Sequence, residues 1–260
     1  MNPHQTSPKN ATRTEVRHDL TELDGTLPDN EVHVWQAEIV ASEAVAGAGS
    51  NFLDAGEHAR ASRFLVAGAR EQFVLSRAFL RFTLGRYLRM DPRELRFRTA
   101  EYGKPELAGD ADLKFNLSHT DGATVIAVTR AGRVGVDVER IRENLDPIEL
   151  GDRFFSRKEA EWLRSQSVWE RFAAFFACWT AKEAYIKAWG EGLSMPLAGF
   201  GLIPKGGNAK LELEVYGKPG SAENWSIWQL DAGPGLCSAT AVECQDCIVR
   251  AGKWSFDSML

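Results

Sequence analysis

The chain has 260 residues, of which 44% are hydrophobic and 26% are charged. This composition is typical of a globular protein with one or two domains. The formal net charge of −5 argues against a generally basic protein that coats nucleic acid, so we expect no nucleic-acid partner. No apolar run approaches the roughly 20 residues that span a bilayer, and the N-terminus lacks an apolar signal core. We therefore expect a cytoplasmic protein without membrane association.

The cysteines are too sparse for a disulfide framework: Cys178, Cys237, Cys244 and Cys247. The last two have CxxC spacing, but a zinc site needs a second pair of ligands, and only Cys237 is close by in sequence. We interpret them as ordinary strand or loop cysteines.

The first half of the chain predicts a tail, a strand, a long helix and three more strands. Residues 1–30 are polar and contain Pro, Asn and Thr, so we expect a mobile tail. Residues 31–39 predict a strand, and residues 56–88 have apolar positions at helical spacing, with a stop at Asp91 and Pro92. Further strands are expected at residues 94–100, 113–118 and 123–129, the last two joined by a TDG turn.

The second half repeats this order of a helix followed by strands. It begins with a strand at residues 134–140, and helices are expected at residues 156–163 and 168–190. The closing strands are expected at residues 210–217, 225–230 and 236–243. We therefore predict an α/β (α+β) fold of two similar lobes, residues 31–132 and 133–260, each a mainly antiparallel sheet packed with a long helix.

The stretch VGVDVER, residues 134–140, places two carboxylates side by side. Its valines alternate with the other residues, so they share one strand face, and Asp137 and Glu139 share the other. Side chains two apart on one face lie roughly 7 Å apart. Two carboxylates there repel each other unless solvent screens them or a cation lies between them.

A third carboxylate interrupts an aromatic stripe on the helix expected at residues 168–190. Glu183 shares its helix face with Phe176 and Trp179, where a carboxylate is costly unless it is paired or binds a metal. Lys187, four residues on, could supply an ordinary ion pair. Read together with Asp137 and Glu139, however, Glu183 completes a set of oxygen ligands that favours Mg²⁺, which is commonly shared with substrate phosphates. Mn²⁺ also suits such ligands.

Cationic and hydrogen-bonding partners for phosphate occur in three places. Ser118 and His119 end an alternating strand, and Lys104 is presented by the turn in EYGKPEL. Basic residues also follow the first long helix: Arg60, Arg63 and Arg77. Each signal has an ordinary structural alternative, namely a structural histidine, a simple turn and a solvated basic helix face.

Taken in order, the motifs are more specific than any one of them alone. The series YGKP, FNLSH, VGVDVE, FFSRKEAEWL and WTAKEAYIKAWGEGLSMPL resembles the Sfp-type 4′-phosphopantetheinyl transferases from about residue 57 to residue 200. The resemblance implies a monomer of two α/β lobes related by a pseudo-twofold axis. It also implies that coenzyme A and Mg²⁺ bind in the cleft between the lobes.

The resemblance implies transfer of the phosphopantetheine arm of coenzyme A to a serine of an apo acyl or peptidyl carrier protein, releasing adenosine 3′,5′-bisphosphate. By similarity, Asp137, Glu139 and Glu183 ligate Mg²⁺. Glu183 is the candidate base, acting directly or through a metal-bound water. Lys187 is suited to contact the pyrophosphate or the leaving bisphosphate. Lys182 is either structural or a secondary phosphate contact.

Further residues match coenzyme A-binding positions of that family. Ser118 and His119 match positions that bind its phosphates, and Arg60 matches a position that grips the 3′-phosphate. The adenosine-binding turn corresponds to Gly103, Lys104 and Pro105.

The partner and two rival functions stay open at this point. Carrier proteins are usually acidic and so is this chain, so attraction requires a local patch; residues 142–158 are our candidate for carrier contact. The carrier could serve fatty-acid, polyketide or nonribosomal-peptide synthesis. The rivals are a non-catalytic protein that binds coenzyme A or a carrier, and a Mg²⁺-dependent phosphohydrolase.

Overall fold

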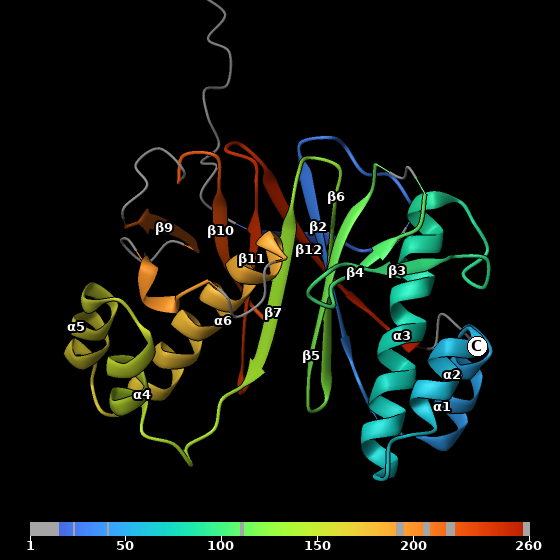
Figure 1. Ribbon diagram of the computed structural model, residues 1–260, viewed down its shortest axis with the longest axis horizontal. Coiled ribbons are helices and arrows are strands. Elements are labelled where there is room, and N and C mark those ends of the chain that lie inside the picture. The colour runs from blue at the N-terminus through green and yellow to red at the C-terminus, as the bar shows by residue number, and fades with distance from the viewer. Residues whose placement is uncertain are drawn as a thin grey trace, which may run out of the picture.

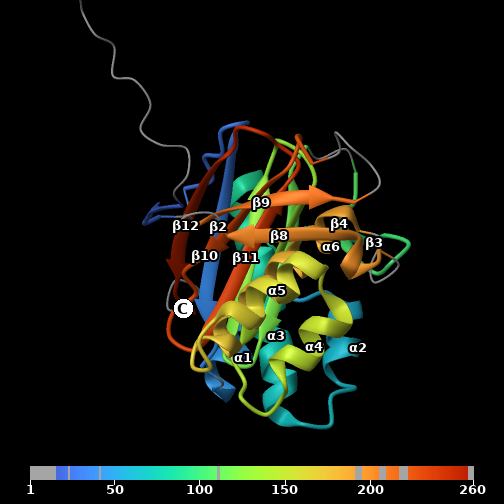
Figure 2. The ribbon, with the colours of Figure 1, turned by 90° about the vertical axis from the view of Figure 1, so that its left-hand side faces the viewer.

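The computed structural model describes residues 16–256 except 23, 41, 110–111, 191–194, 205–208 and 217–221. Within these residues the chain forms two five-stranded sheets and one two-stranded hairpin. Figure 1 shows the two sheets side by side, with the long helix α3 beside one and the long helix α6 beside the other. Figure 2 shows both long helices on the same side of the sheets. The predicted fold class, a mixed α and β fold of two lobes, is confirmed.

The first half of the chain carries three helices and six strands within the described residues. The helices are α1 (Glu43–Ser50), α2 (Ala55–Ala61) and α3 (Ala67–Leu88). The strands are β1 (Arg17–Leu20), β2 (Glu31–Glu38), β3 (Phe97–Thr99), β4 (Pro105–Leu107), β5 (Lys114–Thr120) and β6 (Ala123–Thr129).

The second half also combines helices with six strands within the described residues. Its helices are α4 (Pro147–Phe154), α5 (Arg157–Ser165), α6 (Arg171–Trp189) and the short 3₁₀ helix η2 (Leu197–Gly199). Its strands are β7 (Val134–Arg140), β8 (Phe200–Pro204), β9 (Lys210–Val215), β10 (Ser226–Leu230), β11 (Leu236–Val242) and β12 (Ile248–Trp254). No helix of the described residues is long and apolar enough to cross a membrane.

The last strand returns to the first sheet. The sheet orders are β1-β12-β2-β6-β5 and β7-β11-β10-β9-β8, and β12 runs parallel to both of its neighbours, β1 and β2. The first sheet therefore takes strands from both ends of the described chain. The division into lobes at residues 31–132 and 133–260 stays a prediction, and sequence patterning did not foresee that β12 crosses it.

Part of the expected tail is ordered. Residues 17–20 form β1, and the Arg250 side chain on β12 donates a hydrogen bond of 2.8 Å to Asp19 on β1. Polar composition hid this strand because an edge strand can keep polar side chains towards solvent. Residues 1–15 lie outside the described part of the chain.

The helix predicted at residues 56–88 is two helices. Asp54 and Glu57 form a capping box that starts α2, which ends at Ala61, and α3 begins at Ala67. Glu57 is buried and forms ion pairs with Arg77 and Arg81 of α3. These pairs hold α2 against α3, and a continuous helix could not make them because its axis would carry Glu57 away from α3.

The two sheets meet through an apolar layer on the face opposite the long helices. Val134, Val136 and Val138 of β7 pack there with side chains from both sheets, including Val34 and Trp228. This placement confirms the predicted alternation of β7, since its other face is left to Asp137 and Glu139.

A buried polar chain fixes the first sheet to α3. The indole of Trp35 donates to the hydroxyl of Tyr87 (2.7 Å), which donates to Nδ1 of His33 (2.8 Å), while Nε2–H of His33 donates to Glu31 (2.8 Å). Every group has a partner only when the imidazole is neutral, because the carboxylate accepts and the hydroxyl can then donate to Nδ1. Burial lowers the pKa of His33 in agreement with this tautomer.

We predict that this buried network of hydrogen bonds makes the free energy of unfolding fall at acidic pH. A histidine with a lowered native pKa contributes fully above its unfolded pKa of about 6.5, and its contribution is lost as the pH falls below that value. Urea unfolding at pH 7.5 and 5.5 should therefore show a larger loss for the native sequence than for His33→Gln. His58→Gln, at an exposed position of α2, should keep the full loss. Equal losses in the native chain and His33→Gln would contradict the assignment.

Candidate functional site

The carboxylates come together because helix α6 lies unusually close to strand β7. A Cβ atom on Gly135 would lie 2.0 Å from the carbonyl oxygen of Ala184 and 2.4 Å from the amide nitrogen of Ala188. Only glycine therefore allows this packing. The contact sets Glu183 and Lys187 of α6 opposite the polar face of β7.

Asp137 is the centre of the resulting cluster. Its side chain is only 5% exposed, and Oδ1 accepts hydrogen bonds from the Ser118 hydroxyl (2.9 Å) and the Lys187 ammonium (2.6 Å). Lys187 also donates to the Ser118 oxygen at 2.9 Å. The second oxygen, Oδ2, is buried without a hydrogen-bond partner. Such an oxygen is costly unless a cation or a donor approaches it.

Strand β5 is fixed beside β7 by a side chain that sequence reading missed. The side-chain oxygen of the buried Asn116 accepts a hydrogen bond of 2.8 Å from the backbone amide of Val136. This link holds Ser118, two residues along β5, next to Asp137. The signal was present in FNLSH, where a polar residue lies between the apolar residues Phe115 and Leu117 of a predicted strand.

Glu139 and Glu183 complete an acidic group around Asp137. Burial raises the pKa of both glutamates, and repulsion from Asp137 raises the two values further. Arg142 lies 3.7 Å from Glu139 across an exposed ion pair. The structure therefore brings together the three carboxylates predicted from sequence closely enough for their charges to interact.

The carboxylate oxygens of the acidic group are ligands that suit a divalent cation, but the three carboxylates do not converge on one point. No three His, Cys, Asp or Glu side chains of the described residues converge on one position that could hold a metal ion. Like charges keep the carboxylates apart, and Lys187 neutralises part of the charge of Asp137. The unpaired Oδ2 of Asp137 and the raised pKa values of Glu139 and Glu183 are what an oxygen-coordinated hard cation would relieve.

A cationic rim lies next to the carboxylates. Desolvation by burial lowers the pKa of His119, and the charges of Lys187 and Arg60 lower it further, although solvent still reaches the imidazole. Arg60 is exposed and lies over the ring of Phe73, 5.1 Å from its centre. The positive charges of Arg60 on α2 and Lys187 on α6 thus reach His119 on β5, and this region is suited to an anionic ligand.

The other basic candidates have different surroundings. Arg77 is committed to the ion pair with Glu57, and burial lowers its pKa. Arg63 is exposed just after the end of α2. The structure gives neither side chain a contact with the acidic group.

Lys182 lies in the core rather than in the cleft. Its ammonium donates to both oxygens of Glu159 (2.9 and 2.7 Å) and to the carbonyl of Phe200 (2.6 Å), and neither charged side chain is exposed. The backbone amide of Leu202 also donates to Glu159. Of the two alternatives left open by the sequence, the structural role is the one these contacts support.

The turn at Gly103, Lys104 and Pro105 reaches the far end of the same helix and strand. Gly103 has a positive φ of 86°, which suits glycine in a tight turn. The Lys104 ammonium donates to the carbonyls of Val134 (2.9 Å) and Lys187 (2.8 Å). Lys104 and Pro105 line a hollow of about 600 Å³, together with Tyr102.

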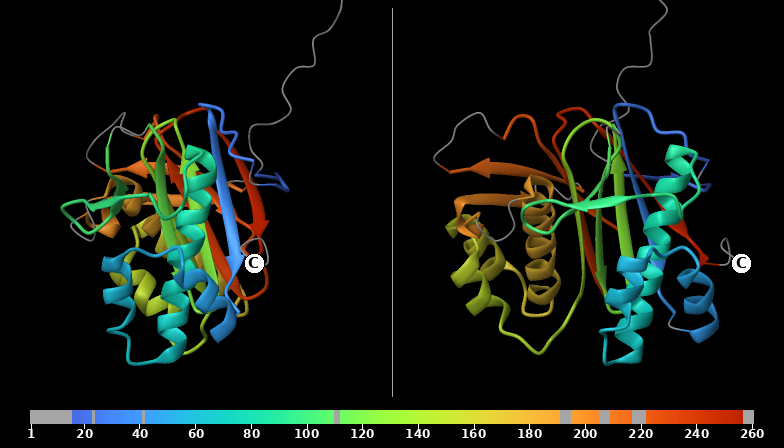
Figure 3. Two further views of the ribbon diagram at one scale, coloured as in Figure 1. Left: turned by 90° about the vertical axis from the view of Figure 1, so that its right-hand side faces the viewer. Right: turned by 45° about the vertical axis from the view of Figure 1, so that its right-hand side comes forward.

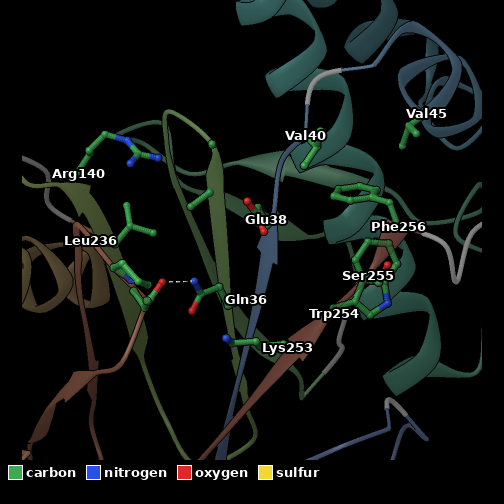
Figure 4. Close-up of a pocket in the computed structure, with 15 residues that line it drawn as sticks. Gln36, Glu38, Val40, Val45, Arg140, Leu236, Lys253, Trp254, Ser255 and Phe256 are labelled. Atoms are coloured by element: carbon green, nitrogen blue, oxygen red, sulfur yellow. Dashed lines mark hydrogen bonds between the residues drawn. The ribbon is translucent and has the colours of Figure 1, made fainter.

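A second hollow, of about 660 Å³, lies on the opposite face of the junction between the sheets (Figure 4). Gln36, Glu38 and Lys253 line it, together with Arg140. Arg140 alternates with Glu139 along β7, so its side chain leaves the other face of the strand. This larger hollow is therefore not the acidic cluster, and its lining offers no concentration of one charge.

The structure corrects our interpretation of Cys244 and Cys247, which lie in the connection between β11 and β12. Cys244 and Cys247 form a disulfide, with their Cα atoms 5.6 Å apart. The tight turn between the two strands brings the residues together, which spacing alone did not establish. Cys178 and Cys237 are free.

Comparison with known proteins adds two family matches. Residues 133–240 match the model of the 4′-phosphopantetheinyl transferase superfamily, and residues 42–131 match a model described as 4′-phosphopantetheinyl transferase, N-terminal. Together the two matches include β5, β7 and α6, the elements that carry the acidic group and Ser118.

Curated relatives agree with these matches. The chain is 37% identical to the 4′-phosphopantetheinyl transferase HetI of Nostoc sp. over 65% of its own length and 73% of that protein. It is 30% identical to the 4′-phosphopantetheinyl transferase Sfp of Bacillus subtilis over 63% of its own length and 72% of that protein. Among solved structures, the holo-[acyl-carrier-protein] synthase of Thermotoga maritima aligns with a TM-score of 0.36 at 20% identity, covering 43% of this chain and 62% of that one.

We predict that Lys182 contributes to folding rather than to chemistry. Lys182→Met leaves the buried charge of Glu159 unpaired, which costs about 3–5 kcal/mol of unfolding free energy. The double variant Lys182→Met/Glu159→Leu should recover part of this loss, because no lone charge remains buried although the Leu202 amide loses its acceptor. Urea unfolding measures both variants, and Lys158→Met, at an exposed ion pair with Glu214, is a control expected to change little. A single variant as stable as the native chain would contradict the prediction.

Proposed function

Because the chain belongs to the Sfp-type 4′-phosphopantetheinyl transferase family, we propose that it moves the phosphopantetheine group of coenzyme A onto a serine of an apo acyl or peptidyl carrier protein. The observation that carries this proposal is the cluster in which Asp137 holds Ser118 and Lys187 and keeps one buried oxygen unpaired. The cluster offers acidic groups for a cation and cationic groups for phosphates within one cleft.

The metal-holding part of the proposal assigns the acidic group to one divalent cation. Asp137, Glu139 and Glu183 would hold Mg²⁺, or Mn²⁺, because both prefer oxygen ligands. Such an ion supplies charge neutralisation at the diphosphate of coenzyme A. The three carboxylates lie close enough for their charges to interact, which supports their assignment to one ion.

The proton of the acceptor serine needs a base. In the proposed reaction the serine oxygen forms a bond to the β-phosphorus and the bond from that phosphorus to the bridging oxygen breaks. Adenosine 3′,5′-bisphosphate leaves with the electron pair, and the serine proton passes to Glu183. Glu183 is the candidate base because its carboxylate lies in the acidic group, and it would act directly or through a water held by the cation.

The cationic rim receives the phosphates. We assign Lys187 to the diphosphate and the departing bisphosphate, and His119 and Arg60 to the 3′-phosphate, since the positive charges of Lys187 and Arg60 act on His119. Ser118, held by Asp137, is placed to donate to a phosphate oxygen when its hydroxyl rotates. The backbone of Gly103 and Pro105 is assigned to the adenosine.

The carrier is assigned to the surface around residues 142–158, which include α4. Partly buried apolar side chains are present there, among them Leu145, Ile148 and Phe154. We propose that one chain provides the complete site, because both halves of the cleft come from it. We also place the reaction in the cytoplasm, where coenzyme A and carrier proteins occur.

The acidic group, considered by itself, would also suit a Mg²⁺-dependent phosphohydrolase, which is the alternative function. It differs from the transferase because it would cleave coenzyme A without a carrier. A non-catalytic protein that binds coenzyme A or a carrier would cleave and transfer nothing, and it would have less need for a carboxylate base beside a metal ion.

We predict that the chain adds phosphopantetheine to an apo carrier in the presence of Mg²⁺ and coenzyme A. Mass spectrometry of the carrier should show a serine-linked adduct, abolished by EDTA. Glu183→Gln should slow its formation about 100-fold or more, because general-base catalysis typically contributes at least that factor. Glu161→Gln on the exposed face of α5 serves as the matched control. An unmodified carrier across several carrier types, or release of phosphopantetheine to water without a carrier, would contradict the transferase.

We also predict that Mg²⁺ stabilises the protein independently of catalysis. At pH 7, millimolar Mg²⁺ should raise the melting temperature, because it binds the native acidic group and relieves its repulsion. The triple variant Asp137→Asn/Glu139→Gln/Glu183→Gln should melt at the same temperature with and without the ion. If Mg²⁺ still changed the melting temperature of the triple variant, the ion would bind elsewhere.

A further inference from the structure

The tip of the β3–β4 hairpin joins the two lobes through one side chain. Leu107 of β4 is buried in the core beneath α3, so the base of the hairpin belongs to the first lobe. Its tip extends in front of the strands towards α6 (Figure 3, right). There the Lys104 ammonium donates to the carbonyl oxygens of Val134 on β7 and Lys187 on α6, and more weakly to that of Ala188 at 3.5 Å.

These acceptors lie on the two elements that carry the acidic group. The last carbonyls of a helix have no partner within the helix, and a cation there also interacts favourably with the helix dipole. In α6 the carbonyl of Ile186 accepts from the Gly190 amide, whereas those of Lys187 and Ala188 face Lys104. Lys104 therefore acts as a side-chain cap for α6 that comes from the other lobe.

The same ammonium fixes the start of β7. Val134 is three residues before Asp137, and Lys187 is one helical turn after Glu183. Displacement of either carbonyl would change the distance across which the Lys187 side chain reaches Asp137 and Ser118.

We propose that Lys104 is a positioning residue, which sets the register of α6 against β7 from the opposite lobe, and not a residue that binds the nucleotide through its ammonium. This inference rests on the proposed transferase function. A lysine has three N–H donors, and three carbonyls already surround them. Gly103 and Pro105 keep the adenosine role assigned above.

The ammonium is maintained at a cost in stability. Burial lowers the pKa of Lys104 to about 8, so desolvation of the charge outweighs its attraction to nearby acidic groups. Lys104→Met removes the desolvation cost of this partly buried charge but also takes the donor from the carbonyls of Val134 and Lys187, so the two effects on stability oppose each other. A purely structural role would instead predict a marked loss of stability, which separates the two interpretations.

The experiment compares Lys104→Met with Lys104→Arg and with Lys114→Met. Lys114 lines the same hollow and is exposed, so its variant removes a charge without removing these hydrogen bonds. For Lys104→Met we expect a nearly unchanged melting temperature, a kcat for carrier modification about 10-fold lower, and a KM for coenzyme A within about twofold. Amide hydrogen exchange in residues 186–190 should become faster in the ligand-free protein. Lys104→Arg should restore part of kcat, and Lys114→Met should behave as the native chain.

Three outcomes would overturn the inference. A raised KM with unchanged kcat and unchanged exchange would show direct nucleotide binding. A large fall in melting temperature with activity lost in proportion would show a structural residue only. Unchanged kcat and exchange would show no role. If the native chain itself modifies no carrier, the proposed function fails, while the exchange of residues 186–190 still tests the cross-lobe contact.

Discussion

The packing of α6 directly on β7 is the contact on which the rest of the site depends. Gly135 makes it possible, because any side chain at this position would meet the helix backbone. The consequence is electrostatic. Three carboxylates and one lysine from separate segments share a partly buried space, and the pKa values of Glu139 and Glu183 rise because their charges are neither solvated nor balanced. The protein keeps this unfavourable arrangement where a cation and a phosphorylated ligand would stabilise it.

The surrounding structure supplies the stability that the cluster lacks. Behind β7 the valines join the two sheets in an apolar layer, and beside it Lys182 and Glu159 hold α5, α6 and β8 together with every polar atom paired. Lys182 and Lys187 are close in sequence but have different roles. Lys182 is sealed in the core, whereas Lys187 lies at the cleft with a third of its side chain exposed.

Local patterns predicted much of the fold because they record local physics. The alternation of VGVDVER gave the correct faces of β7, and the order of motifs indicated the family that the comparisons support. The return of β12 to the first sheet could not be read in this way, since strand pairing between distant segments leaves no periodic signal. The break between α2 and α3 was missed because apolar spacing continues through it, while the ion pairs of Glu57 that bend the chain are tertiary. In the site, residue types indicated Asp137, Glu139 and Glu183, but the direction of the Lys104 side chain depends on a contact between lobes that no spacing encodes.

The most direct measurement of the central claim is a crystal structure with Mn²⁺ and coenzyme A, in which anomalous scattering locates the ion. We expect one peak within about 2.0–2.3 Å of oxygens from Asp137, Glu139 and Glu183, adjoining the diphosphate. An ion bound elsewhere, with the Lys187 ammonium still bonded to Asp137 and Glu183 turned away from the diphosphate, would contradict this claim.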